Sequence, residues 1–327
     1  MPKTNKAEII SLCKKINSKE GQGSIYSLGN DKGLKLPRWS TNLEDLDAII
    51  GGGMPEGRII EIFGPEASGK TSLGYYLMSL HSLALDIPIE GTFDAERAKV
   101  FGNKPKQMLV YRAHYGEQAM NKAVQFAQAG IPLIVIDSIP ACKPREDIEK
   151  LLKMAKTESE NQERIGGVAR LMHRYLPLLE EICESTGTTL ILINQVRDKM
   201  DAMLFGEKTD TPGGRAPKFY SSIRIQVARR AWIEIPNKDV YNSAANKKVG
   251  MIMKCKVIKS KVSNPMGECE LPMFFDRGFV SFDDVADIRK ELMNAQRKNK
   301  KDKNADEEEY GEDEWIIDGM SNLQKNG

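Results

Sequence analysis

Long apolar runs are missing from this 327-residue sequence. The longest stretches, such as Leu133–Ile136, are far shorter than the roughly 20 residues that a membrane-spanning helix needs. No apolar segment near the N-terminus is typical of a secretory signal. We therefore expect a cytoplasmic protein that makes no contact with a membrane.

Cysteine, histidine and an excess of charge of one sign are also scarce. The five cysteines form no C-x-x-C pair and no metal-ligand spacing, so we expect reduced thiols, and the three scattered histidines predict no metal site. Lys and Arg number 48 against 46 Asp and Glu, a net charge of +2. The overall charge therefore does not indicate a nucleic-acid partner, and any such site must come from local clusters.

The most informative stretch that is present is Gly64-Pro-Glu-Ala-Ser-Gly-Lys-Thr71, which fits the pattern G-x-x-x-x-G-K-[ST]. Its glycines let backbone N–H groups point at phosphate oxygens, its Lys reaches the outer phosphates, and its hydroxyl suits Mg²⁺. A chance glycine turn is the alternative, but a strand-like run precedes the octet and an apolar helical pattern follows it. The residues expected to bind nucleotide are Gly64, Pro65, Glu66, Ala67, Ser68, Gly69, Lys70, Thr71 and Ser72, together with Asp94 and Asp137.

Strand-like apolar runs alternate with helical segments from Arg58 to about Asn194. This alternation predicts an α/β fold with a mostly parallel central sheet and helices on both faces. Three later runs predict antiparallel strands at one edge of the sheet. The expected strands are 59–63, 87–93, 108–111, 133–137, 188–194, 223–227, 251–258 and 268–275, and the expected helices begin at Lys70, Glu117 and Gly166.

Two short helices are expected ahead of this core. Apolar residues at helical spacing predict one over Lys6–Ser18, which Gly21–Gly23 ends. Periodicity cannot decide whether this helix packs on its own core or on a neighbouring subunit. The second helix is expected to open with a capping box at Thr41 and Glu44 and to end at Gly51.

Carboxylates follow two of the predicted strands. The run Leu133–Ile136 ends in Asp137, an arrangement that supports Mg²⁺ in NTPases. Asp94 and Glu96 follow the preceding strand, and we expect Glu96 to orient and deprotonate the attacking water. A solvated strand end is the alternative for this pair. Because ligands bind at the carboxyl ends of parallel strands, Asp94, Asp137 and Gln195 are expected around the nucleotide.

Several further motifs accompany the phosphate loop. The full set is Gly64–Thr71, Asp94-Ala-Glu96, Gly116-Glu-Gln-Ala119, Val135-Ile-Asp-Ser138, Asn194-Gln-Val-Arg197, Gly213-Gly214, Lys218-Phe-Tyr220, Lys259-Ser-Lys261 and, near the N-terminus, Gly23–Gly29. In their order and closely similar spacing, these motifs resemble the bacterial RecA recombinases over roughly residues 7–280. The resemblance implies a RecA-like P-loop NTPase core that uses ATP and Mg²⁺. It also implies a DNA-dependent ATPase that forms helical filaments on single-stranded DNA, pairs them with homologous duplex and exchanges strands in recombination and DNA repair.

The resemblance also implies roles for individual residues. Asp137 would support the metal ion, and Gln195 would sense the γ-phosphate and couple it to the DNA loop that follows. Lys259 and Lys261 would reach the neighbouring subunit's ATP and stabilise charge there as an arginine finger does. The catalytic residues implied are Glu96, Lys70, Gln195, Lys259 and Lys261, with Thr71 and Asp137 for Mg²⁺.

Two polar stretches, 157–167 and 196–218, match the family's DNA-binding loops. A DNA filament needs cations for phosphates and apolar wedges for bases, and the second loop has both kinds of residue. Its methionines could instead form a small hydrophobic core. The DNA-binding residues expected are Ile165, Gly166, Arg170, Arg197, Lys199, Met200, Gly213 and Gly214. Arg164, Arg174 and Arg215 are added from charge alone, with a solvated surface as the alternative for each lone arginine.

The domain organisation departs from the family at the C-terminal end. We expect an oligomerisation arm over 1–33, the ATPase core over 34–280, a short helix over 281–300 and an acidic, disordered tail over 301–327. The tail either screens DNA binding or only raises solubility. The shortened C-terminal region is consistent with a phage-encoded relative acting in the host-cell cytoplasm. The segment after Glu96 is also shorter than usual, so Phe101 is only a guess for the adenine-stacking residue.

Partners and alternatives follow from these features. We expect single-stranded and double-stranded DNA, further copies of the chain, and single-strand-binding and mediator proteins as partners. Three other functions stay open at this point: a ring-forming helicase or translocase, a DNA-coating filament with little hydrolysis, and a nucleotide-binding accessory protein that never touches DNA.

Overall fold

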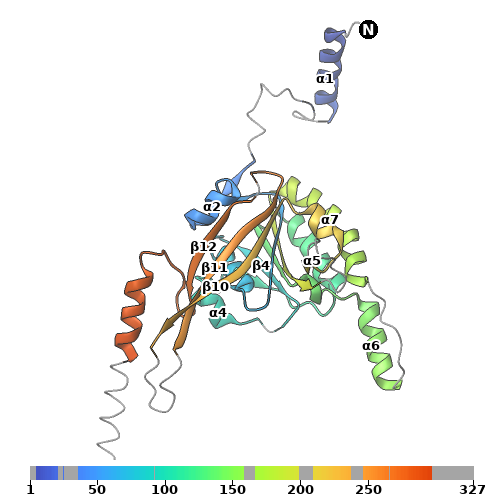
Figure 1. Cartoon of the computed structure of the whole chain (residues 1–327). Helices are drawn as coiled ribbons and strands as arrows, with labels where there is room; N and C mark the ends of the chain where they lie inside the picture. The colour runs from blue at the N-terminus through green and yellow to red at the C-terminus, as the bar shows by residue number, and fades with distance from the viewer. Residues whose placement is uncertain are drawn as a thin grey trace, which may run out of the picture.

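The computed structural model describes residues 5–20, 25, 36–91, 93–157, 166–198, 209–236, 246–264 and 266–296. A nine-stranded sheet formed by these residues is the centre of the protein (Figure 1). Its strand order is β13-β12-β11-β10-β3-β7-β6-β4-β5. The strands are β3 (Ile59–Gly64), β4 (Ala84–Pro88), β5 (Met108–Val110), β6 (Leu133–Asp137), β7 (Thr189–Gln195), β10 (Ile223–Ile235), β11 (Lys247–Ser260), β12 (Glu268–Phe274) and β13 (Gly278–Phe279).

The sheet confirms the predicted fold class. Strands β10, β3, β7, β6, β4 and β5 are parallel to their neighbours in that order. Strands β10 to β13 form the antiparallel edge. Two smaller antiparallel pairs lie outside this sheet, β1 (Arg38–Trp39) with β2 (Met54–Pro55), and β8 (Arg197–Asp198) with β9 (Thr209–Asp210).

Helices cover both faces of the sheet, and each face has its own apolar core. Alternate residues of a strand point to opposite faces, so Ile60 joins one core and Ile59 the other. The first core includes α2 (Glu44–Ile50), α3 (Lys70–Ser79) and α4 (Ala95–Val100), and the second includes α5 (Gly116–Gln128) and α7 (Gly167–Thr186). Within the described residues, no helix is long and apolar enough to span a bilayer.

The capping of α2 differs from the prediction. The N-cap position is Leu43, whose apolar side chain cannot accept a hydrogen bond from the helix N-terminus. Glu44 is already the first helical residue. The Thr41 hydroxyl instead donates to Asp47 at 2.7 Å, and Asp47 also accepts the Thr41 N–H. The prediction of a C-terminal stop was right, because Gly51 takes the left-handed conformation that ends the helix.

One strand lies earlier in the sequence than predicted. Strand β4 ends at Pro88, whereas the sequence predicted a strand over 87–93. Pro88 has no N–H to continue the ladder, and the next two N–H groups, of Ile89 and Glu90, donate to the carbonyl of Asp137. The first acid after the strand is therefore Glu90, and this shift changes the candidate site.

In the part of the chain that the structure describes, three helical segments lie outside the main layers. Helix α1 (Lys6–Glu20) confirms the predicted N-terminal helix, stands apart from the sheet in Figure 1 and exposes Ile9, Ile10 and Leu12. Helix α6 (Arg145–Thr157) projects from the core and was not predicted. Residues 285–296 are helical, as expected, and Arg289 donates to the Glu234 carbonyl at 3.0 Å.

Candidate functional site

The phosphate-binding loop joins the centre of the sheet to α3. Ala67 and Gly69 both have positive φ, 53° and 89°, and such a backbone turns successive N–H groups toward one point. A side chain at Gly64 would collide with the Val227 carbonyl on β10, so the loop requires glycine there. The Lys70 ammonium donates to the Pro65 carbonyl at 2.6 Å and is nearly buried. Burial lowers the pKa of Lys70, while Asp137, Glu90 and Glu66 raise it.

A buried hydroxyl in this loop has no partner among the described residues. The Oγ of Ser68 is inaccessible to solvent and makes no hydrogen bond to any of them. An unpaired buried polar atom is costly, and a phosphate oxygen would satisfy it. The loop geometry and this atom both fit a bound phosphate group.

Thr71 and Asp137 form the metal-binding candidate. The Thr71 hydroxyl donates to Asp137 Oδ2 at 2.6 Å. Burial raises the pKa of Asp137, Thr71 and Lys70 lower it, and Glu90 raises it. The described residues contain no group of three or more His, Cys, Asp or Glu that could hold a metal alone. The two oxygens fit Mg²⁺, which usually takes one or two protein ligands and completes its shell with phosphates and water.

Glu90 faces this group across the end of the sheet. Its Oε1 accepts a hydrogen bond from the side-chain amide of Gln195, the last residue of β7. Glu90 is also close enough to Lys70 and Asp137 to shift the pKa of both. The sequence placed Gln195 here but missed Glu90, because the predicted strand ran past it. Pro88 was the available signal, since a proline commonly marks the end of a strand.

Glu96 and Asp94 are at the start of α4 and do not directly follow a strand. The Glu96 side chain is 83% exposed on α4 and pairs with Lys99 of the same helix at 2.6 Å. Asp94 caps α4 by accepting the Arg97 N–H at 3.0 Å. The expectation that these two acids follow a strand directly was wrong, because β4 ends six residues before Asp94.

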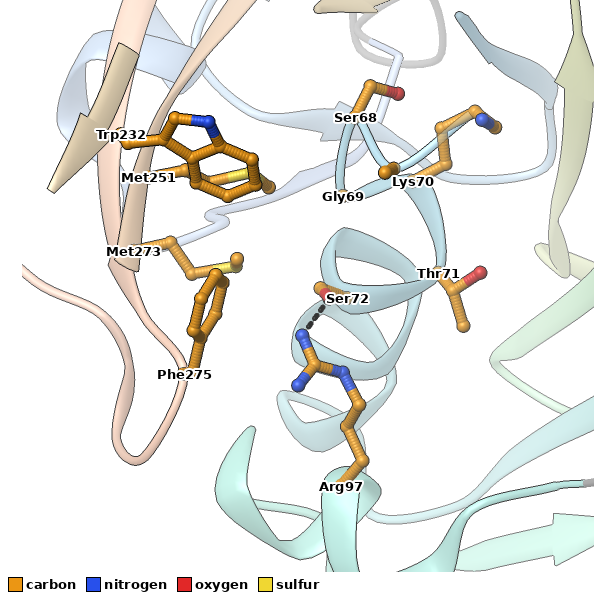
Figure 2. A pocket seen from close by; sticks show the side chains of 11 residues that line it. Ser68, Gly69, Lys70, Thr71, Ser72, Arg97, Trp232, Met251, Met273 and Phe275 are labelled. Atoms are coloured by element: carbon orange, nitrogen blue, oxygen red, sulfur yellow. Dashed lines mark hydrogen bonds between the residues drawn. The ribbon is translucent and has the colours of Figure 1, made fainter. Parts of the chain in front are cut away.

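A pocket of about 270 Å³ opens beside the phosphate loop. Figure 2 shows the side chains that line it. The loop and the start of α3 form one side, and Arg97 donates to the Ser72 hydroxyl at 3.0 Å there. Large side chains from the antiparallel strands, and one from the turn that follows β12, form the other side. These side chains, which the sequence did not predict for the site, are Trp232, Met251, Met273 and Phe275.

Aromatic and cationic groups are interleaved around this pocket. Arg97 lies over the ring of Phe275 at 6.0 Å, and Trp232 packs edge-on to the same ring at 6.2 Å. Arg229 lies over Trp232 at 4.1 Å, and Lys248 over it at 4.6 Å. The guessed base-stacking residue, Phe101, is instead buried in the core and is not among the residues that line the pocket.

Lys259 and Lys261 do not line the pocket of their own chain. The Lys259 ammonium donates to the carbonyls of Lys218 and Phe219 at 2.6 and 2.9 Å, at the end of α8 (Arg215–Tyr220). Lys261 is 3.3 Å from Glu180. Burial, with Lys261 and Arg224, lowers the pKa of Lys259 to about 8.

The bases of the two expected DNA loops lie next to each other. Gly166 precedes α7 and Gly214 precedes α8, and α7 packs against α8. Gly214 lies so close to Ala169 that a Cβ on it would approach the Ala169 Cβ to 2.9 Å. Arg170, Arg174, Arg197 and Arg215 are exposed, and Gly213 is buried. Ile165, Arg164, Lys199 and Met200 lie outside the described residues.

Together, the parallel sheet, the loop between β3 and α3 and the acid at the end of β6 define a P-loop NTPase core. The family model for the RecA N-terminal domain matches residues 7–280. The chain belongs to the RecA family. The family consists of DNA-dependent ATPases of recombination and DNA repair, so membership confirms the activity expected from the sequence and favours none of the alternatives.

Curated relatives support the same assignment. Protein RecA of Ruminococcus albus is 36% identical over 283 residues, which are 85% of this chain and 67% of the relative. Protein RecA of Sulfurimonas denitrificans is 34% identical over 86% of this chain and 79% of the relative. For Protein RecA of Thermus aquaticus the identity is 33%, over 88% of this chain and 82% of the relative.

Proposed function

We propose that this chain hydrolyses ATP when it is assembled on single-stranded DNA, and that the filament pairs this DNA with homologous duplex and exchanges strands in the cytoplasm. The observation that carries the proposal is the hydrogen bond between Glu90 and Gln195. It joins the acid beside the phosphate loop to the residue from which the second DNA loop departs, since Arg197 follows two residues later. The hydrolytic site and the DNA loop therefore share one contact.

In this proposal the phosphate loop holds the triphosphate, and Lys70 leaves the Pro65 carbonyl to contact the outer phosphates. Thr71 and Asp137 would hold Mg²⁺, which would neutralise charge on the phosphates. Glu90, and not Glu96, accepts the proton of the attacking water. The supporting reason is the position of the two acids. Glu90 accepts a hydrogen bond from Gln195 and is close enough to Lys70 and Asp137 to shift the pKa of both. Glu96 is exposed and pairs with Lys99.

Substitution of the two glutamates tests this assignment directly. Glu90→Gln keeps the size of the side chain and removes the base, so DNA-stimulated ATP hydrolysis should fall about 100-fold or more. Binding of a non-hydrolysable ATP analogue should persist. Glu96→Gln is the matched control and should hydrolyse ATP at the wild-type rate. The reverse pattern, loss with Glu96→Gln and retention with Glu90→Gln, would restore the assignment made from sequence.

We also propose that the nucleobase occupies the pocket beside the loop, between Arg97 and the wall that contains Trp232 and Phe275. A planar guanidinium and aromatic rings both offer flat faces to a base. Arg97→Ala should raise the Kd for ADP about tenfold, the scale of one desolvated cation–π contact. Lys99→Ala, on the same helix, should leave the Kd unchanged, and equilibrium titration with a fluorescent ADP analogue measures both.

Assembly completes the proposed site. Lys259 and Lys261 lie away from their own pocket, which supports a role at the neighbouring subunit's ATP. The apolar residues exposed on α1 suit an arm that packs on a second copy of the chain. DNA would be held where the bases of the two loops meet, with Arg170, Arg197 and Arg215 as the cations. Single-strand-binding and mediator proteins remain proposed partners.

A further inference from the structure

A buried polar cluster connects β3, β7, β10 and the base of the second DNA loop. We name it the Glu61 cluster; its members are Glu61, Asn194, Thr211 and Arg224. Glu61 and Asn194 are fully buried, and Thr211 and Arg224 are 6% and 9% exposed. Burial of polar and charged side chains costs folding free energy unless each of them is hydrogen-bonded or ion-paired.

The pairing is nearly complete and spans four separate segments. Glu61 accepts from Arg224 Nε with one oxygen and from Asn194 Nδ2, at 2.8 Å, with the other. Arg224 Nη2 donates to the Thr211 hydroxyl at 3.3 Å, and its guanidinium lies 4.6 Å from the centre of the Phe63 ring. The members thus hold one another in fixed positions in the interior of the protein.

Asn194 connects the cluster to the nucleotide side. Its Oδ1 accepts the N–H of Gln195 at 2.9 Å, and Gln195 contacts Glu90 through its side chain. The same Asn194 amide nitrogen donates to the Pro212 carbonyl at 2.9 Å. One side chain therefore contacts both the residue beside Glu90 and the segment where the second loop returns to the core.

Thr211 and Pro212 anchor the returning end of the loop. The neighbouring Asp210 pairs with Lys218 of α8, and α8 supplies the carbonyls that hold Lys259. Hydrogen bonds thus connect Gln195 through Asn194 to Pro212, and through Asn194, Glu61 and Arg224 to Thr211. Stability alone explains such a cluster poorly, because buried ion pairs can often be replaced by apolar residues without loss of stability.

We propose that Glu61 and Arg224 are positioning residues that fix the base of the second DNA loop relative to Gln195. Through them, occupancy of the nucleotide site changes the affinity of the loop for DNA, and by linkage DNA changes the affinity for nucleotide. This inference rests on the proposed function and adds to it the residues that couple its two ligands.

The test measures coupling separately from folding. The affinity for a single-stranded oligonucleotide is measured with a non-hydrolysable ATP analogue and with ADP, and the ratio of the two is the coupling factor. The double variant Glu61→Leu, Arg224→Met removes both charges together, so thermal unfolding should occur at or above the wild-type temperature. Its coupling factor should fall at least fivefold toward one, since allosteric coupling is typically 5-fold to 150-fold.

Arg58 and Glu184 give the matched control. They form an ion pair of 2.8 Å at the start of β3, at the end of the strand away from the phosphate loop. Arg58→Gln, Glu184→Gln should keep the wild-type coupling factor. Arg224→Lys keeps the buried charge beside Glu61 but shortens the reach to Thr211, so it should fold and lose part of the coupling. If the double variant does not fold, the coupling factor of Arg224→Lys tests the proposal instead.

A folded variant of Glu61 or Arg224 whose coupling factor stays within twofold of wild type would overturn the inference. If the wild-type protein itself binds DNA equally well with the ATP analogue and with ADP, both the inference and the proposed function fail. The two failures are therefore distinguished by the wild-type measurement.

Discussion

Asp86 is a buried acid next to the candidate site, and its burial makes the stability of the protein depend on pH. It lies in the middle of β4, is 2% exposed, and neighbours Asp137 and Tyr75. Burial, and then the charge of Asp137, raise its pKa well above the ordinary value. The charged form is disfavoured in the folded state, so stability is lost as pH rises above about 4 toward the folded-state pKa.

Asp86→Asn should therefore stabilise the nucleotide-free protein at neutral pH. We expect an increase of about 1 kcal/mol, or roughly 2–4 °C in Tm, and a smaller difference at pH 5 than at pH 7.5. Thermal unfolding at both pH values measures it. The exposed Asp283→Asn should change Tm at neither pH, and equal stabilisation by both variants would contradict the role assigned to burial.

Residue identities could be predicted from the sequence where a motif fixes the spacing. Gly64 to Thr71 is such a motif, and the strand and helix that it requires are both present. Glu90 could not be ranked above Glu96, because that choice depends on the residue at which β4 ends. The polar Asp86 within β4 hides the strand from a search for continuous apolar runs. Trp232 reaches the pocket from β10 and Phe275 from the turn after β12, and both are distant from the phosphate loop in sequence, so no local pattern reveals them.

At the scale of elements, α8 restrains a lysine that the proposed assembly needs. Lys259 donates to two carbonyls at the end of α8, where the helix dipole favours a cation. Its pKa of about 8 means that part of the population is neutral in the free subunit at slightly alkaline pH. A neighbouring triphosphate would favour the ammonium form, so assembly there takes up a proton.

We predict that filament assembly weakens between about pH 7.5 and 9. Lys259→Arg should remove most of this pH dependence, because the guanidinium stays protonated throughout this range. Light scattering with DNA and a non-hydrolysable ATP analogue measures assembly at each pH. Lys256→Arg, an exposed residue of the same strand, should keep the wild-type profile. An unchanged profile in Lys259→Arg would assign the titration to another group.

Elements were predictable where one residue pattern continues for several turns or along a whole strand. The apolar run of β6 was predicted with its observed bounds, and α1, α3, α5 and α7 begin within one residue of the prediction. Helix α6 was missed because its charged residues outnumber its apolar ones, and short helices such as α4 and α8 depend on the packing around them.

On the scale of the whole molecule, a net charge near zero conceals a local cationic surface. Arg170, Arg197 and Arg215 are exposed near the bases of the two loops. If each contacts one phosphate, Arg197→Gln or Arg215→Gln should reduce the slope of log K against log salt concentration by about 0.7 for single-stranded DNA. Binding to a labelled oligonucleotide between 50 and 200 mM salt measures the slope.

Lys290→Gln, on the C-terminal helix, is the control and should leave the slope unchanged. A uniform loss of affinity without a change of slope would show that the arginines shape the loops and do not contact phosphate.

The order of strands in the sheet also matters while the chain is being synthesised. Strand β3 carries the phosphate loop but lies between β7 and β10, and β10 ends about 170 residues after Gly64. At 5–20 residues per second, roughly 10–30 s pass between emergence of the loop from the ribosome and emergence of its last neighbour. During that interval the nascent chain exposes the edges of β3, and nucleotide can begin to stabilise the domain only after most of the chain has been made.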